Sequence, residues 1–136
     1  MTNTNNIRLS DAADLPTVAL LMEEAFGASA QLPINPAYIA DSNIHCFVLE
    51  IDNTIVATAA LHILQKVNRK LGQIEDVVVA QSQRGKGLGK TIVTHLLQVS
   101  ADQGCYKTIL NATDENIPFY NTLGFRVEQN QLVIRH

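Results

Sequence analysis

The chain has 136 residues, of which 46% are hydrophobic and only 17% are charged. This composition predicts one domain over residues 1–136 with its own core, and it excludes long disordered regions. The net charge of −3 argues against a dedicated nucleic-acid-binding protein. No signal peptide and no membrane-spanning apolar run is recognisable, so a cytoplasmic location is expected. Cys46 and Cys105 are isolated, which predicts two reduced thiols and no metal site.

The first half of the chain predicts a short strand, a helix and then a pair of strands. Ser10 or Asp11 can cap the helix, and its apolar residues recur at helical spacing from Leu15 to Phe26, before Gly27. The two prolines between Gln31 and Ser42 indicate a loop with at most one helical turn. Strands are expected over 7–9, 45–51 and 54–64, with a tight turn at residues 52–53.

The second half alternates strands with helices. A strand is expected over 71–79, and a helix over 87–101 that ends before Gly104. A strand over 106–110 and a short helix over 115–122 follow, with Asp114 as a possible cap. Two last strands are expected over 125–128 and 131–135. This order indicates a mixed α/β sheet rather than a doubly wound one.

The stretch QRGKGLGKT, from Gln83 to Thr91, joins an apolar strand to an amphipathic helix. A nucleoside-triphosphate loop needs a further glycine where Arg84 stands, and the dinucleotide fingerprint needs one where Lys90 stands. A third pattern, Arg-x-x-Gly-x-Gly, fits Arg84, Gly87 and Gly89. Glycines let backbone N–H groups approach phosphate oxygens, and the start of the helix favours anions. The stretch therefore predicts a phosphate-binding loop, with Lys86 and Lys90 as additional cationic donors.

This loop, the helix and strand after it, and the segment FYNTLGF from Phe119 to Phe125 resemble the GCN5-related N-acetyltransferase (GNAT) superfamily. The resemblance implies an α/β (α+β) fold, a single domain with a mixed, mostly antiparallel sheet flanked by helices. It also implies acetyl-CoA as co-substrate. Within the superfamily, GQIEDVVV at 72–79 and GCYK at 104–107 are similar to the glucosamine-6-phosphate N-acetyltransferases. These enzymes of UDP-N-acetylglucosamine biosynthesis acetylate an amino-sugar phosphate, and the resemblance implies a homodimer. The net charge and the missing apolar run separately predict no nucleic-acid partner and no membrane partner.

The resemblance implies three catalytic residues: Glu75, Asp76 and Tyr120. Glu75 and Asp76 would border the sugar site, whereas Tyr120 would donate a proton to the departing thiolate. Adjacent residues of a regular strand face opposite sides of the sheet. Both carboxylates therefore face one cleft only if a β-bulge redirects one of them.

The family pattern also implies two sets of binding residues. The backbone N–H of Val77 is the candidate to polarise the thioester carbonyl. The residues expected to contact acetyl-CoA are Val77, Val78, Val79, Arg84, Gly85, Lys86, Gly87, Leu88, Gly89, Lys90, Asn111 and Asn116. Those expected to contact the sugar phosphate are Lys66, Glu75, Asp76, Tyr106, Lys107 and Arg135.

Asn111 departs from the family pattern, which usually has an aspartate at this position beside the active centre. An amide carries no charge to hold an ammonium group, and this favours a second hypothesis, acetylation of another small primary amine. A third hypothesis is a sensor that binds acetyl-CoA without catalysis. The presence of Glu75 and Tyr120 beside the glycine loop argues against the sensor, which would need only the loop.

Overall fold

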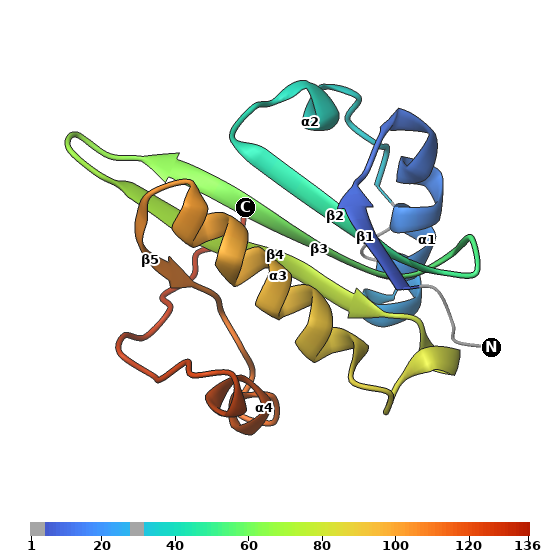
Figure 1. The fold of residues 1–136 in the computed structure, drawn as a ribbon. Helices are drawn as coiled ribbons and strands as arrows, with labels where there is room; N and C mark the ends of the chain where they lie inside the picture. Colours follow the sequence, from blue (N-terminus) through green and yellow to red (C-terminus); the bar gives the residue numbers. More distant parts are fainter. Residues whose placement is uncertain (1–4, 28–31) are drawn as a thin grey trace.

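The computed structural model describes residues 5–27 and 32–136, and it shows a five-stranded sheet with helices on both faces (Figure 1). The order of the strands in the sheet is their order in the chain, and neighbours are antiparallel except for the last, parallel pair. The expected mixed, mostly antiparallel sheet is thereby confirmed. The strands are β1 (Asn5–Leu9), β2 (Ile44–Ile51), β3 (Thr54–Gln65), β4 (Lys70–Val79) and β5 (Cys105–Ile109).

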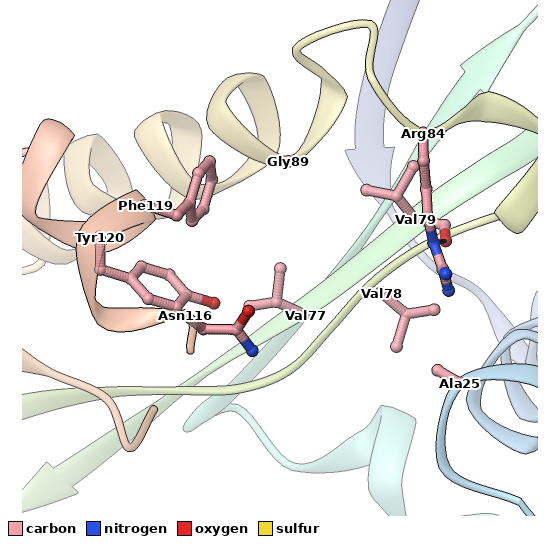
Figure 2. Close-up of a pocket in the computed structure, with 9 residues that line it drawn as sticks. All are labelled: Ala25, Val77, Val78, Val79, Arg84, Gly89, Asn116, Phe119 and Tyr120. Carbon is pink, nitrogen blue, oxygen red and sulfur yellow. Dashed lines mark hydrogen bonds between the residues drawn. The ribbon is translucent and has the colours of Figure 1, made fainter. Parts of the chain in front are cut away.

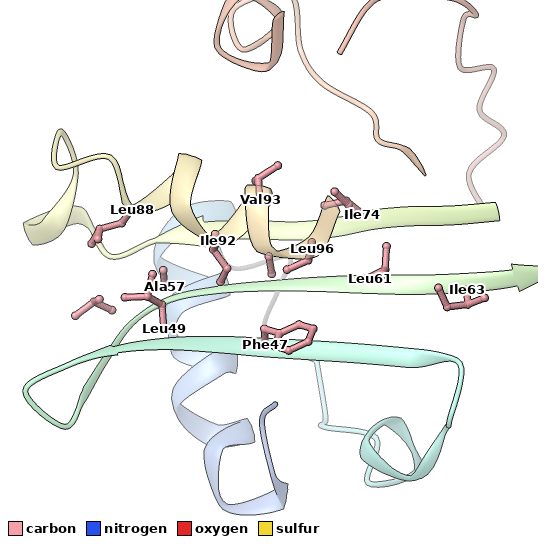
Figure 3. Packing of buried hydrophobic residues seen from close by; sticks show 12 residues of the cluster. Phe47, Leu49, Ala57, Leu61, Ile63, Ile74, Leu88, Ile92, Val93 and Leu96 are labelled. Carbon is pink, nitrogen blue, oxygen red and sulfur yellow. The ribbon is translucent and has the colours of Figure 1, made fainter. Parts of the chain in front are cut away.

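The described part of the chain also contains four α-helices and two short 3₁₀ turns, of which all but the last helix, α4, lie between strands. The helix α3 crosses one face of the sheet, and α1 and α2 lie on the other (Figures 1 and 3). The elements are η1 (Ala12–Asp14), α1 (Leu15–Phe26), α2 (Ala37–Ala40), η3 (Gln81–Gln83), α3 (Leu88–Asp102) and α4 (Ile117–Thr122).

A capping box with Asp11 as N-cap opens the 3₁₀ turn η1, which leads directly into α1, and Asp11 is one of the two caps that the sequence predicts. The Asp11 carboxylate accepts hydrogen bonds from the backbone N–H groups of Ala13 and Asp14, at 3.0 and 3.2 Å. The Asp14 carboxylate accepts one from the Asp11 N–H at 2.8 Å, and it also pairs with the Arg8 guanidinium at 2.7 Å. Arg8 donates in addition to Glu50 of β2. These contacts tie β1, β2 and the start of α1 together at one edge of the sheet.

The core lies between α3 and the sheet (Figure 3). Ile92, Val93 and Leu96 of α3 have no exposed surface, and they pack on residues such as Leu49 and Leu61 from the central strands. Burial of each large aliphatic side chain contributes about 1.5–3 kcal/mol. Ile74 of β4 belongs to this core, so the core fixes the position of the strand that carries the acidic pair.

The two strands expected at the C-terminus do not form, and this expectation is wrong. Residues 125–136 have no regular secondary structure, and residues 126–136 are exposed. Residues 125–131 lie across a cavity of about 660 Å³ from the end of β5 instead of pairing with it. A strand needs a partner for its backbone groups, and in the described part of the single chain these segments have none.

Two smaller expectations about the loops also need adjustment. The helix α4 begins at Ile117, and its N-cap is Asn116 without a side-chain cap hydrogen bond, so Asp114 does not cap it. The expected loop before β2 contains the single short helix α2, although its first residue, Gln31, lies outside the described residues. The turn between β2 and β3 has positive φ at Asp52 and Asn53 (51° and 65°), which suits a two-residue hairpin turn.

Candidate active site

The parallel strands β4 and β5 separate partway along their length. Their pairing begins at Lys70 and Cys105 and ends with Gln73 opposite Ile109. From Ile74 to Val79, β4 has no partner strand on its β5 side in the described structure. Backbone N–H and C=O groups need hydrogen-bond partners. This open side of β4 can therefore bind an extended ligand in the place of a strand.

A β-bulge lies in the same part of β4. Ala60 of β3 pairs with Glu75, but Thr58 pairs with Val78, so β4 has one extra residue between these pairs. Asp76, within the bulge, has a φ of 55°, in the left-handed region that few non-glycine residues adopt. The register shift thus coincides with the acidic pair, as two carboxylates on one cleft require.

The environment of Asp76 disfavours its charged form. Desolvation raises the pKa of the Asp76 carboxyl above its usual value, and the nearby Glu75 carboxylate raises it further, against an opposing effect from His62. One oxygen of Glu75 accepts a hydrogen bond of 2.6 Å from the Gln73 side chain. The bulge therefore holds two carboxyl groups close together just beyond the point where β4 and β5 separate.

A pocket of about 350 Å³ lies between the end of β4 and α4 (Figure 2). Figure 2 shows the hydroxyl end of Tyr120 pointing toward Val77, with the Asn116 side chain beside it. The pocket is lined by Ala25, Val77, Val78, Val79, Arg84, Gly89, Asn116, Phe119 and Tyr120. Seven of these nine residues are among those that the sequence indicates for acetyl-CoA or catalysis; Ala25 and Phe119 are the exceptions.

The glycine-rich loop joins this pocket to the start of α3. Gly85 and Gly87 have φ values of 79° and 77°, and no atom lies within 4 Å of where a Cβ would stand at either position. The loop therefore has the left-handed backbone that favours glycine, and it has open space for a ligand. The side chains of Lys86 and Lys90 are exposed, whereas Leu88 is buried in the core. Leu88 can therefore offer a ligand only its backbone.

Tyr120 lies between the pocket and the aromatic side chains of the C-terminal segment. Its ring makes edge contacts with Phe119 and Phe125, with centroids 5.0 and 5.8 Å apart. Desolvation raises the pKa of the Tyr120 phenol above its usual value. The phenol therefore keeps its proton at neutral pH, and a general acid requires this.

The cations expected at the sugar phosphate lie elsewhere, at the far end of β4. The Lys107 ammonium lies 5.4 Å from the centroid of the exposed Tyr106 ring, and the Arg69 guanidinium lies 5.1 Å from it. The hydrogen bond from Arg69 lowers the pKa of the Tyr106 phenol. Desolvation opposes this effect, and the charges of Lys107 and Lys66 add to it. These groups form a cationic cluster of Lys66, Arg69 and Lys107 around one phenol.

Two of the expected site residues belong neither to the 350 Å³ pocket nor to the cationic cluster. Asn111 follows β5 and lines the 660 Å³ cavity rather than the smaller pocket. Arg135 is exposed in the C-terminal segment, which has no regular structure. The single chain therefore brings many of the expected acetyl-CoA residues together at the smaller pocket, but not Asn111.

Several residues near the bulge escape the sequence patterns. Tyr38 lies in a segment predicted as a loop, and His62 lies in a strand where histidine carries no motif. Strand alternation places His62 on the same face of the sheet as Ala60, and this was the one signal in the sequence that could have placed His62 near the acidic pair. Phe119 belongs to the motif FYNTLGF but was not assigned a contact with the ligand, and Arg69 lies outside every motif.

Both cysteines are free thiols, as expected; Cys46 is buried and Cys105 is partly buried. Within residues 5–27 and 32–136, no group of three or more histidine, cysteine and acidic side chains is placed to hold a metal ion. None of the described helices is both long and apolar enough to cross a bilayer.

Comparison with known proteins agrees with this geometry. The chain is 46% identical over 81 residues to glucosamine 6-phosphate N-acetyltransferase of Trypanosoma brucei brucei, in an alignment that covers 57% of this chain and 55% of that protein. The chain spans about half the length of the curated relatives that it matches.

Solved structures resemble the chain over almost its whole length. An acetyltransferase of Trypanosoma brucei has a TM-score of 0.84 and 32% identity, covering 98% of this chain and 100% of that one. Glucosamine-6-phosphate N-acetyltransferase of Arabidopsis thaliana has a TM-score of 0.82 and 28% identity, covering 97% and 98%. The pattern of the acetyltransferase (GNAT) family matches residues 15–125. With the separated strands, the bulge and the glycine loop in place, the chain belongs to the GNAT acetyltransferase family.

Proposed function

We propose that the protein transfers the acetyl group of acetyl-CoA to the amine of glucosamine 6-phosphate, giving N-acetylglucosamine 6-phosphate. The single observation that carries this proposal is the coincidence of the strand separation and the bulge at Glu75 and Asp76. Similarity to glucosamine 6-phosphate N-acetyltransferases supports the choice of substrate.

Acetyl-CoA binds with its pyrophosphate at the glycine loop and its pantetheine arm along β4. Backbone N–H groups near Gly85 and Gly87 donate hydrogen bonds to the phosphate oxygens. The N-terminus of α3 and the ammonium groups of Lys86 and Lys90 add positive charge. The amide groups of the arm pair with the open side of β4 from Ile74 to Val79. The thioester then reaches the pocket between Val77 and Tyr120.

Acetyl transfer uses groups on both sides of this pocket. The backbone N–H of Val77 polarises the thioester carbonyl, and the acidic pair attracts the sugar ammonium. The amine nitrogen bonds to the carbonyl carbon, the carbon–sulfur bond breaks, and Tyr120 gives its proton to the sulfur. No metal is required in this scheme.

The sugar phosphate needs cations, and we assign this role to the cluster of Lys66, Arg69 and Lys107 near the start of β4. Arg135 would join it from the C-terminal segment of a second copy. This segment exposes apolar side chains, among them Leu132 and Ile134, which are 90% and 85% exposed. Because β5 is an edge strand with a free side, the segment of one copy can pair with an edge of the other, so we propose a homodimer.

The proposal includes a cytoplasmic location and a place in UDP-N-acetylglucosamine biosynthesis, because both substrates are intracellular metabolites. A second candidate, acetylation of another small primary amine, is favoured by the neutral side chain of Asn111. A thiol-release screen over amino sugars, their phosphates and polyamines tests both. Faster release with glucosamine 6-phosphate than with glucosamine supports the proposal. Faster release with another amine supports the second candidate, and acetyl-CoA binding without any release indicates a sensor.

A further inference from the structure

A second set of polar side chains lies on the α2 face of the sheet, beside the bulge. Ala60 pairs with Glu75 and His62 pairs with Gln73, so the side chains of His62, Gln73 and Glu75 share one face. From α2, Tyr38 approaches the same place, with its ring centroid 6.2 Å from that of His62 at an angle of 56°. The imidazole is therefore held between the short helix and the strand that carries the acidic pair.

The groups around His62 interact electrostatically. Asp76 and Glu75 face it from β4, Tyr38 faces it from α2, and Cys46 lies on the same face of β2. At the turn after α2, the Asp41 carboxylate accepts a hydrogen bond from the Asn43 backbone N–H at 2.8 Å. Burial raises the pKa of the Tyr38 phenol, and Cys46, Asp76 and Glu75 raise it further. Because each of these groups affects the pKa of another, their side chains lie close together on the α2 face of the sheet.

These neighbours differ in their ability to accept a proton. Tyr38 retains its own proton, and the Cys46 thiol is buried against the Thr58 hydroxyl at 3.8 Å. Carboxylates are weak bases, and imidazole is the side chain that ordinarily titrates near neutral pH. Efficient proton transfer favours a base that titrates near the working pH. His62 is therefore the best-suited proton acceptor on this face.

We propose that His62 accepts the proton that the acceptor ammonium must lose before it attacks the thioester, with Tyr38 positioning the imidazole ring. This inference rests on the proposed acetyl transfer. Because His62 pairs with Gln73 and Ala60 pairs with Glu75, Glu75 is the diagonal neighbour of His62, about 7–8 Å away between Cα atoms. An amine held at Glu75 can therefore reach the imidazole directly or over one bridging water.

The step balances as follows. One ammonium proton passes to a ring nitrogen of His62 and then to water. The neutral amine adds to the carbonyl carbon, and the carbon–sulfur bond breaks as the Tyr120 phenol protonates the sulfur. The second amine proton, released as the amide forms, restores the phenol. The net products are the amide, coenzyme A thiol and one proton in water.

The test compares His62→Gln and His62→Ala with the control His45→Gln, whose side chain lies on the opposite face of the sheet by strand alternation. The pH profile of kcat/KM is measured with whichever amine the wild type acetylates best. His62→Gln should lower kcat/KM by about 10²-fold or more and remove its low-pH limb. Free imidazole should restore part of the activity of His62→Ala, which a packing role would not predict. The control should match the wild type.

Calorimetric titration with acetyl-CoA shows whether each variant still folds and binds. A His62→Gln variant with wild-type kcat/KM and an unchanged low-pH limb overturns the role of His62, and so does a His62→Ala variant that imidazole does not rescue. A wild type that acetylates only another amine overturns the choice of sugar, and the His62 comparison then decides on that amine. A wild type that acetylates no amine overturns the proposed function and the role of His62 together.

Discussion

Gln73 of β4 pairs with Ile109 of β5, and beyond this pair the two strands separate. The bulge at Asp76 follows three residues later on the same strand. One short segment therefore presents free backbone groups on its β5 side and acidic side chains beside them. This arrangement suits a reaction that needs an extended cofactor arm and a positively charged amine at the same point.

Tyr120→Phe tests the general acid. The change keeps the ring contacts with Phe119 and Phe125 but removes the phenolic proton. General-acid catalysis contributes about 10²–10⁴-fold in rate, and because a thiolate leaves easily, we expect kcat to fall near the lower end. Steady-state kinetics should show this loss while calorimetry shows unchanged affinity for acetyl-CoA. Full kcat with rate-limiting chemistry would reduce Tyr120 to a packing residue.

Asp76→Asn should make the protein more stable and less active. The pKa of Asp76 is raised in the folded state, so folding favours its protonated form. The stabilisation that this proton gives is complete below the unfolded pKa, near 4, and is lost as pH rises through the folded pKa. Asparagine stays neutral and tolerates the left-handed backbone. The gain in Tm should therefore be larger at pH 7 than at pH 4, whereas kcat/KM should fall about tenfold or more. An equal or lower Tm at pH 7 would show that the carboxylate is not destabilising.

Gly72→Ala tests the close contact between β4 and α3. A Cβ at Gly72 would lie 2.3 Å from the Ser100 hydroxyl oxygen, which accepts a hydrogen bond from Thr108 at 2.7 Å. Overpacking of this kind costs about 1–3 kcal/mol. Urea unfolding should show that loss, and Ser100→Gly in the same chain should restore part of it. If the stability losses of the two changes simply add, the contact with Ser100 is not the cause of the loss at Gly72.

Asp14→Asn should weaken the junction of β1, β2 and α1. The Arg8 guanidinium holds the pKa of the Asp14 carboxyl down to about 2, helped by its capping contacts with Asp11 and opposed by desolvation. Its contribution is present above the unfolded pKa, near 4, and is lost as pH falls toward 2. Since the Arg8 side chain is 35% exposed, we expect a loss of only about 1–2 kcal/mol at pH 7.

The control for Asp14→Asn is Glu128→Gln, which breaks the exposed pair with Arg126. Denaturant unfolding of the control should show no measurable loss. If Asp14→Asn keeps its deficit at pH 2, the deficit comes from packing rather than from the charge.

Local features of the fold were predictable from the sequence. The capping box at Asp11, the hairpin turn at Asp52 and Asn53, and the glycine loop before α3 all depend on residues that are neighbours in the chain. What the glycine pattern does not show is the backbone conformation: at Gly87 the φ of 77° means that a valine would strain the backbone as well as crowd the ligand.

Features that depend on distant contacts were less predictable. Strand alternation shows that Glu75 and Asp76 can share a cleft only if a bulge is present. The sequence does not show whether or where the bulge forms. The alternating residues from Phe125 to Arg135 indicate strands, yet these segments pair with no strand among the residues that the structure describes. The contact between Tyr38 and His62 joins elements separated by the whole of β2, so no spacing in the sequence reveals it.

The central claim is acetyl transfer from acetyl-CoA to the amine of glucosamine 6-phosphate. Purified protein is incubated with both substrates, and mass spectrometry measures the sugar product while a thiol reagent measures coenzyme A. We predict one N-acetylglucosamine 6-phosphate for each coenzyme A thiol released, and much slower turnover with unphosphorylated glucosamine. Thiol release without acetylated sugar, or binding of acetyl-CoA without either product, would contradict the account.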